Sequence, residues 1–184
     1  MFQLPFSKPS IVFEKRLTIV LLPLLIICII IMKYFDAFLV NSVCKNGIVS
    51  FELAKELEIS IAILDSWNGQ SKIAASLSMG FDFLFLIVYS SFIALLIYKL
   101  NERLWNNKSF YAVGNLLIWA VFLAAFFDAI ENLALIKLLL GDLQQHWSTI
   151  AFYFAVLKFA IIIICFIYIL VNLGLFLFRR VTSE

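Results

Sequence analysis

The chain has 184 residues, of which 64% are hydrophobic and only 14% are charged, and its formal net charge is +2. Soluble domains carry about 25% charged and about 45–50% apolar residues. The excess of apolar residues, with a mean hydropathy of +1.05, excludes a single soluble core and indicates a chain whose solvent is a lipid bilayer. The small net charge gives no indication of nucleic-acid binding.

Four apolar segments are long enough to cross a membrane, since a transmembrane helix needs about 20 largely apolar residues. They cover residues 17–34, 75–98, 112–140 and 148–178. The last two exceed the minimum length and are expected to tilt or to project beyond the bilayer. The sequence therefore predicts an all-α membrane protein, a single domain over residues 1–184 that is built as a four-transmembrane-helix bundle.

The first span has the basic flank of a signal peptide, because Lys15 and Arg16 precede it. Its apolar run, however, is longer than the about 7–15 residues of a signal core, and no A-x-A-like cleavage site follows it. We interpret it as a retained anchor. The polar segment before it, residues 1–16, is expected to lie as an arm at the membrane interface.

Basic residues are distributed unequally between the two sides that the spans define. One side holds Lys8, Lys15, Arg16, Lys99, Arg103, Lys108, Arg179 and Arg180, whereas the other holds Lys45, Lys55 and Lys72, with Lys33 and Lys137 near its boundary. Because cytoplasmic loops carry the excess of Lys and Arg, both termini are predicted to be cytoplasmic in a multi-pass protein of a bacterial inner (plasma) membrane. Trp105 suits one interface, and Trp67 and Trp147 suit the other.

The outer loop, residues 36–74, is the longest segment outside the predicted spans. From Ser50, the stretch SFELAKELEISIAIL predicts one amphipathic helix, with Glu52 on its polar face and an apolar face made of Leu53, Leu57, Ile61 and Leu64. Ser50 is the expected N-cap, and WNGQS from Trp67 is expected to end the helix. We predict that this helix packs as a lid over the outer mouth of the bundle.

Polar and ionisable residues interrupt three of the spans. They are Asp82 and Tyr89 in the second span, Asp128, Glu131 and Asn132 in the third, and Lys158 in the fourth. At about 100° per residue, the acids of the third span share a helix face with Ala124 and Ala125, and small residues allow a neighbouring helix to approach closely. These polar side chains are therefore predicted to point into the bundle and not at lipid.

The acids and the lysine also lie at similar depth. A rise of 1.5 Å per residue from the outer boundaries places these four ionisable side chains about 10–18 Å into the membrane. Three carboxylates and one ammonium would leave an excess negative charge, which a dry site does not hold. Either one or two carboxyls keep their protons, or a cation or cationic ligand completes the site.

A purely structural role is the alternative to a binding site, since a network of ion pairs and hydrogen bonds also fixes helix register. No metal or cofactor is predicted, because His146 is the only histidine and Asp82 or Glu131 would give it too few partners for a zinc site. Fingerprints of serine hydrolases, zinc proteases and nucleotide-binding proteins are missing from the sequence. The three cysteines, Cys28, Cys44 and Cys165, are an odd number without paired spacing, which favours packing roles over disulfides. Asp36 is interpreted as a residue at the boundary of the first span.

Two segments, ILDSWNGQSKIAASLSMGFDFLFLIVYSS and FFDAIENLALIKLL, together resemble small bacterial four-span membrane proteins of unassigned function. The shared pattern is D-x-x-x-x-x-x-Y in the second span and D-x-x-E-N in the third, and it implies no activity. A looser likeness, in architecture alone, is to the emopamil-binding and sigma-2-receptor (EXPERA) type. That type has a long first outer loop and membrane-embedded acids that hold the ammonium of a ligand.

The leading hypothesis is an outward-opening acidic pocket within the membrane that binds a lipid-like or cationic small molecule. The residues assigned to it are Asp82, Tyr89, Asp128, Glu131, Asn132 and Lys158. The acids of the third span would anchor the ligand, Asn132 and Tyr89 would orient it, and Lys158 would tune the acids. Any chemistry would be proton transfer between Asp82 and Glu131. Whether the protein is an enzyme stays open.

Two further classes of function stay open as alternatives to ligand binding. One is proton- or cation-coupled transport, for which the candidate polar residues in the inner half are Asn115, Cys165, Tyr168 and Asn172. The other is a non-catalytic accessory or assembly subunit, in which the polar face would pair with a partner in a membrane complex or with a second copy of the chain. In every case membrane lipids are the expected surroundings.

Overall fold

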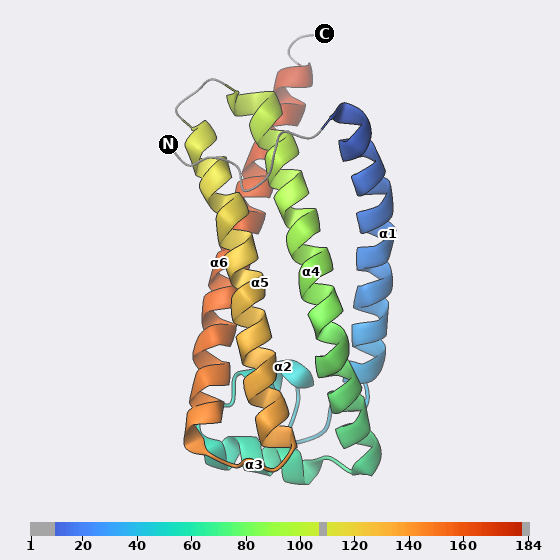
Figure 1. Ribbon diagram of the computed structural model, residues 1–184, viewed down its shortest axis with the longest axis vertical. Coiled ribbons are helices and arrows are strands. Elements are labelled where there is room, and N and C mark those ends of the chain that lie inside the picture. Colours follow the sequence, from blue (N-terminus) through green and yellow to red (C-terminus); the bar gives the residue numbers. More distant parts are fainter. Residues whose placement is uncertain (1–9, 107–109, 182–184) are drawn as a thin grey trace.

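The computed structural model describes residues 10–106 and 110–181, which form six helices and, within these ranges, no strand. In chain order the helices are α1 (Ile11–Asp36), α2 (Ile48–Glu52), α3 (Leu57–Ser66), α4 (Gly69–Trp105), α5 (Tyr111–Leu139) and α6 (Gln145–Val181) (Figure 1). Of these, α1, α4, α5 and α6 are long and apolar enough to cross a membrane. The predicted all-α, four-helix membrane bundle is confirmed.

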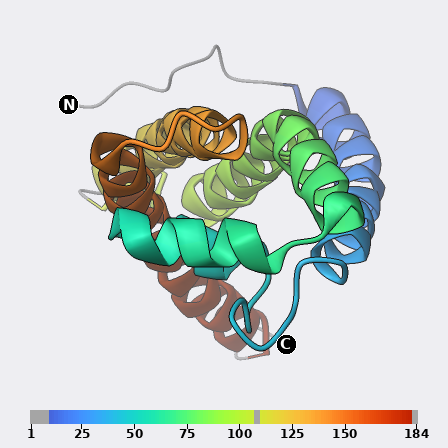
Figure 2. The ribbon, with the colours of Figure 1, turned by 90° about the horizontal axis from the view of Figure 1, so that it is seen from below.

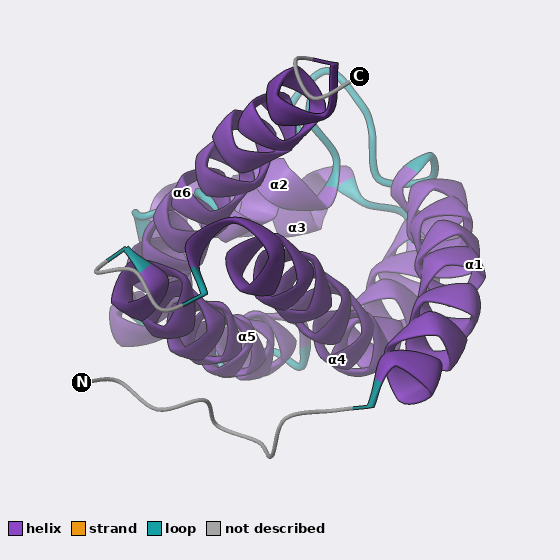
Figure 3. Ribbon diagram, turned by 90° about the horizontal axis from the view of Figure 1, so that it is seen from above, coloured by secondary structure: helices purple, strands orange, loops and turns teal. Residues whose placement is uncertain are grey.

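Helix α5 packs against both α4 and α6, whereas α1 packs on α4 and stands at the edge of the bundle (Figure 3). The first residue of α1 and the last residue of α6 lie at one end of the bundle, which we call the terminal end (Figure 1). The short helices α2 and α3 lie at the opposite end, which we call the cap end. Seen from that end, α3 lies across the bundle (Figure 2).

The long helices extend beyond the predicted spans because side chains cap them in the polar flanks. The Ser10 side chain accepts a hydrogen bond from the Phe13 N–H at 3.3 Å, so residues 11–16 belong to α1. The rest of the arm predicted for residues 1–16 lies almost entirely outside the described residues. Similarly, the Asn68 side chain accepts from the Ser71 N–H at 2.9 Å and starts α4 well before residue 75.

The single amphipathic helix predicted from Ser50 is wrong, because the chain breaks between α2 and α3. Ser50 lies inside α2 and is not an N-cap, and Leu53 is 41% exposed. Gln145 of α6 explains the break: its side chain accepts from the Leu57 N–H at 2.9 Å and donates to the Lys55 carbonyl at 3.0 Å. A distant side chain thus satisfies the backbone groups that a continuous helix would have paired internally.

The two short helices nevertheless pack over the bundle as the predicted lid does. Phe51 of α2 and Ile63 of α3 are buried in one apolar cluster with Ala75 and Leu135 of the long helices. Trp67, predicted at the membrane interface, is only 3% exposed in this cluster, and its ring N–H donates to the Leu39 carbonyl at 3.1 Å. Its burial follows from its place at the end of α3, where the chain turns into α4.

Candidate functional site

The six polar residues that the sequence singles out lie together inside the cap half of the bundle. Asp82 and Tyr89 come from α4, Asp128, Glu131 and Asn132 from α5, and Lys158 from α6. All six are buried. The helices approach closely there because fully buried alanines, Ala124 on α5 and Ala155 on α6, flank the polar positions.

Lys158 is the centre of the cluster. Its Nζ lies 2.7 Å from Asp128 Oδ1 and 2.8 Å from Glu131 Oε2, so one ammonium joins two carboxylates one turn apart on α5. Its side chain is 6% exposed, and an ion pair so shielded is weakened little by water or salt. The contact fixes α6 against α5.

The remaining predicted residues extend this network to α4. Tyr89 donates its hydroxyl hydrogen to Asp128 Oδ2 at 2.9 Å, so that Asp128 accepts from both the lysine and the tyrosine. Asn132 donates its side-chain N–H to Asp82 Oδ2. Amide and hydroxyl donors stabilise the ionised form of the carboxyls that accept from them.

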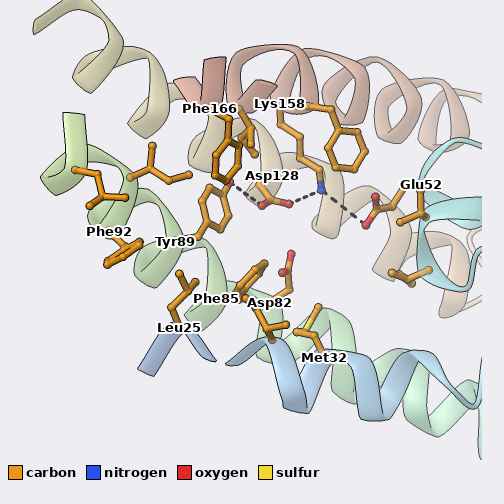
Figure 4. A pocket seen from close by; sticks show the side chains of 17 residues that line it. Leu25, Met32, Glu52, Asp82, Phe85, Tyr89, Phe92, Asp128, Lys158 and Phe166 are labelled. Atoms are coloured by element: carbon orange, nitrogen blue, oxygen red, sulfur yellow. Dashed lines mark hydrogen bonds and ion pairs between the residues drawn. The ribbon is translucent and has the colours of Figure 1, made fainter. Parts of the chain in front are cut away.

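Glu52 of α2 is a member of the cluster that the sequence did not predict. Its Oε1 lies 3.7 Å from the Lys158 ammonium, and the residue is 8% exposed. The sequence placed Glu52 on the polar face of a surface helix, and this assignment is wrong. The cap break turns α2 so that Glu52 points inward, as Figure 4 shows.

The cluster therefore holds four carboxyls and one ammonium among the described residues. Three buried carboxyl oxygens there lack a hydrogen bond: Glu52 Oε2 and both Glu131 oxygens, of which Oε2 still forms the ion pair with Lys158. Burial raises the pKa of Glu52, and the negative charge of Asp128 adds to this rise, while Lys158 opposes it. The excess of carboxyls over ammonium groups is thus larger than the sequence predicts.

A cavity of about 340 Å³ adjoins the cluster. Its polar lining residues are Glu52, Asp82, Tyr89, Asp128 and Lys158, and its apolar walls include Leu25, Phe85, Phe92, Ile162 and Phe166. In Figure 4 the Asp82 carboxylate faces the Asp128, Lys158 and Glu52 groups across this space. Glu131 and Asn132 lie behind the lining residues and are not part of the cavity wall.

The cavity is bounded by α1 on one side, by α6 on the other, and by α2 toward the cap end. Ile29 of α1 and Phe166 of α6 line it and are 44% and 49% exposed, so the cavity reaches the lipid-facing side of the bundle. A second hollow of about 280 Å³ shares Met32 and Phe85 with it and runs along α1 to Lys33. Residues of α2 line the cavity toward the cap end, and the outward opening stays a prediction.

The other candidate residues lie outside this cluster. His146 is exposed in the first turn of α6, about 18 Å of helix rise from Lys158, and stacks on Trp147. Asp36 ends α1, where it accepts from the Ile48 N–H at 2.8 Å and pairs with Lys33 at 3.6 Å. In the described part of the chain, no group of three or more His, Cys, Asp or Glu side chains is arranged to hold a metal ion.

The polar residues of the terminal half form a separate network. Asn101 donates to Asn115 at 3.2 Å and accepts from the Tyr168 hydroxyl at 3.2 Å, and Trp105 donates to Asn172 at 2.5 Å. Between this network and the acidic cluster lies an apolar layer that includes the fully buried Ile97, Ile118, Val121 and Cys165. On α4 and α5 the two networks are separated by about 18–20 Å of helix rise.

A scan against protein-family models, a search of curated proteins and a search of solved structures each found no match. The likeness in the D-x-x-E-N segment and in the EXPERA architecture therefore stays a prediction.

Proposed function

We propose that the protein binds a lipid-like or cationic small molecule in the cavity between α1 and α6. The charged group of the ligand would lie between Asp82 and Asp128, and its apolar part would lie along the aromatic and aliphatic walls. One observation carries the proposal: an apolar cavity ends on three carboxyls, Glu52, Asp82 and Asp128, whose charge a single lysine does not balance.

The cavity limits the size of the ligand. Small-molecule pockets usually measure about 300–1,000 Å³, and the volume of about 340 Å³ falls at the lower end of that range. A whole two-chain phospholipid would not fit, whereas an amphiphile with one short chain would. The exposed lining residues on α1 and α6 support entry from the lipid side, so the ligand need not pass through water.

Asp82 is the residue that distinguishes the proposal best. Asp128 is engaged by Lys158 and Tyr89. Among the described residues Asp82 accepts a hydrogen bond from Asn132 alone, and it faces the cavity from the opposite wall (Figure 4). A charge-assisted contact from a ligand ammonium to this carboxylate is worth about 1.5–3 kcal/mol, which corresponds to about tenfold or more in affinity.

The test compares three amphiphiles of equal chain length, n-octylammonium, n-octanol and n-octyl sulfate, on the purified protein in detergent. Isothermal titration calorimetry should show the ammonium binding most tightly and the sulfate not binding. The Asp82→Asn substitution should weaken the binding of n-octylammonium by about tenfold or more. The matched control is Asp65→Asn, the same change at an exposed position of α3, and it should have no effect. Equal binding of all three amphiphiles would contradict the proposal, and so would an Asp82→Asn variant that binds n-octylammonium as tightly as the wild type.

Transport is a weaker candidate, because the apolar layer separates the acidic cluster from the polar network of the terminal half. We expect no proton flux in liposomes above that of protein-free vesicles. A flux that disappears in Glu131→Gln would favour transport instead. If no amphiphile binds, the cluster is a structural network, and an accessory or assembly role becomes the better hypothesis.

For location, we propose the inner membrane of a bacterium, with the terminal end of the bundle in the cytoplasm. The support is the excess of Lys and Arg in the segments at that end, by the positive-inside rule. Cysteine accessibility measured from each side of intact cells would test the orientation.

A further inference from the structure

The four carboxyls of the cluster differ in the hydrogen-bond donors that they receive. Asp128 accepts from Lys158 and Tyr89, Asp82 accepts from Asn132, and Glu131 pairs with Lys158 at 2.8 Å. Glu52 receives the weakest donor contacts of the four. Its Oε1 lies 3.7 Å from Lys158 Nζ, and its Oε2 has no hydrogen-bond partner among the described residues. A carboxyl that lacks donors is the one that keeps its proton in a buried site.

The neighbours of Glu52 strengthen this conclusion. Further carboxyls surround it: Glu131 and Asp128 on α5, Asp36 at the end of α1, and Asp82 across the cavity on α4. Lys158 of α6 is the positive group that faces it, and this lysine is already shared with two closer carboxylates. Glu52 and Glu131 are both within ion-pair distance of the same Lys158 ammonium, and carboxyls crowded around one ammonium do not all ionise.

Glu52 also lines the cavity, whereas Glu131 lies behind it. A cation that enters the cavity would therefore meet Glu52, Asp82 and Asp128 together. It would supply the positive charge and the N–H donors that Glu52 lacks, and ionised Glu52 would then be favoured over the protonated form.

We infer that the cavity exchanges a proton for an organic ammonium: the proton that Glu52 keeps leaves when the ammonium group enters beside it. This inference rests on the proposed function and deepens it, because it defines the ligand as a protonated amine on a short apolar chain. The step is a displacement without redox change. The Glu52 carboxyl loses its O–H proton to water, and the carboxylate left behind accepts from the ligand N–H.

Linkage gives the measurable consequence. A reaction that releases one proton per ligand becomes about tenfold tighter per pH unit while the site is protonated in the free protein. A primary alkylammonium, like Lys with its pKa of about 10.4, stays charged from about pH 6 to about pH 8, so its own titration does not contribute.

The experiment measures n-octylammonium binding to the wild-type protein by calorimetry, in buffers of different ionisation enthalpy and at several pH values. We expect about one proton released per ligand and a dissociation constant that falls about tenfold per pH unit. In Glu52→Gln, proton release should disappear and the pH dependence should flatten, while binding persists through Asp82 and Asp128. The matched control Glu58→Gln, an exposed glutamate of α3, should behave as the wild type.

Two outcomes would overturn the inference while leaving the proposed function in place. One is wild-type binding without proton release, and this arm stands even if Glu52→Gln does not fold. The other is a full proton released by a folded Glu52→Gln variant. If n-octylammonium does not bind to the wild type at all, the proposed function fails first, and the inference falls with it.

Discussion

Replacing Lys158 with methionine tests the electrostatic centre of the bundle most directly. Methionine keeps an unbranched apolar stem but removes the ammonium that contacts Asp128, Glu131 and Glu52. An interhelical hydrogen bond in a membrane protein contributes only about 0.6 kcal/mol on average. Breaking a buried ion pair by removing one partner costs about 3–5 kcal/mol, because an uncompensated charge stays behind. Since the Lys158 side chain is only 6% exposed, we expect the cost of breaking a buried ion pair and not that of losing one hydrogen bond.

The assay is reversible unfolding by sodium dodecyl sulfate in mixed micelles, followed by circular dichroism. Lys158→Met should lower the free energy of unfolding by about 3–5 kcal/mol at neutral pH. The loss should shrink as the pH falls, because protonation removes the negative charges left without a partner. The control is Lys72→Met, an exposed lysine of α4, which should change stability by less than about 0.5 kcal/mol. A loss for Lys158→Met as small as the control, or one that does not depend on pH, would refute the reasoning.

Three further predictions use the same unfolding assay. Tyr89→Phe removes one hydrogen bond and should cost only about 0.6 kcal/mol, so a loss above about 2 kcal/mol would contradict the network. Gly114→Ala should destabilise by about 1–3 kcal/mol because its Cβ would overlap the Asn101 side chain, whereas Gly80→Ala, with no atom within 4 Å, should gain up to about 1 kcal/mol. Because burial raises the pKa of Glu52, wild-type stability should fall as the pH rises above the ordinary carboxyl value of about 4.3, and Glu52→Gln should flatten that decline.

The four long helices could be predicted from sequence because each must satisfy its backbone internally in lipid, which makes apolar length a strong signal. The cap could not be predicted in detail. Its break depends on Gln145, which lies about 90 residues from the carbonyl and N–H groups that it satisfies. Periodicity describes a helix face but carries no information about such a distant partner.

The same limit explains the cluster. Asp82, Glu131 and Lys158 were recognisable because a charge in an apolar span is costly and has to meet a partner at equal depth. Glu52 gave no such signal, since a glutamate in a polar loop is ordinarily solvated. Only one clue was available: the spans alone left an unbalanced site, which made a further charged group or ligand necessary.

The position of Glu52 is fixed by contacts on both sides of it. An isolated helix of five residues is not stable in water, so α2 depends on its neighbours. Phe51 is fully buried against Trp67, with ring centroids 5.3 Å apart, and the Ile48 N–H is held by Asp36 at 2.8 Å. These contacts direct a carboxyl into a site that already has a negative excess, and that placement lowers the stability of the fold. A carboxyl held there at such a cost is better explained by a site that uses its proton than by a network whose purpose is stability alone.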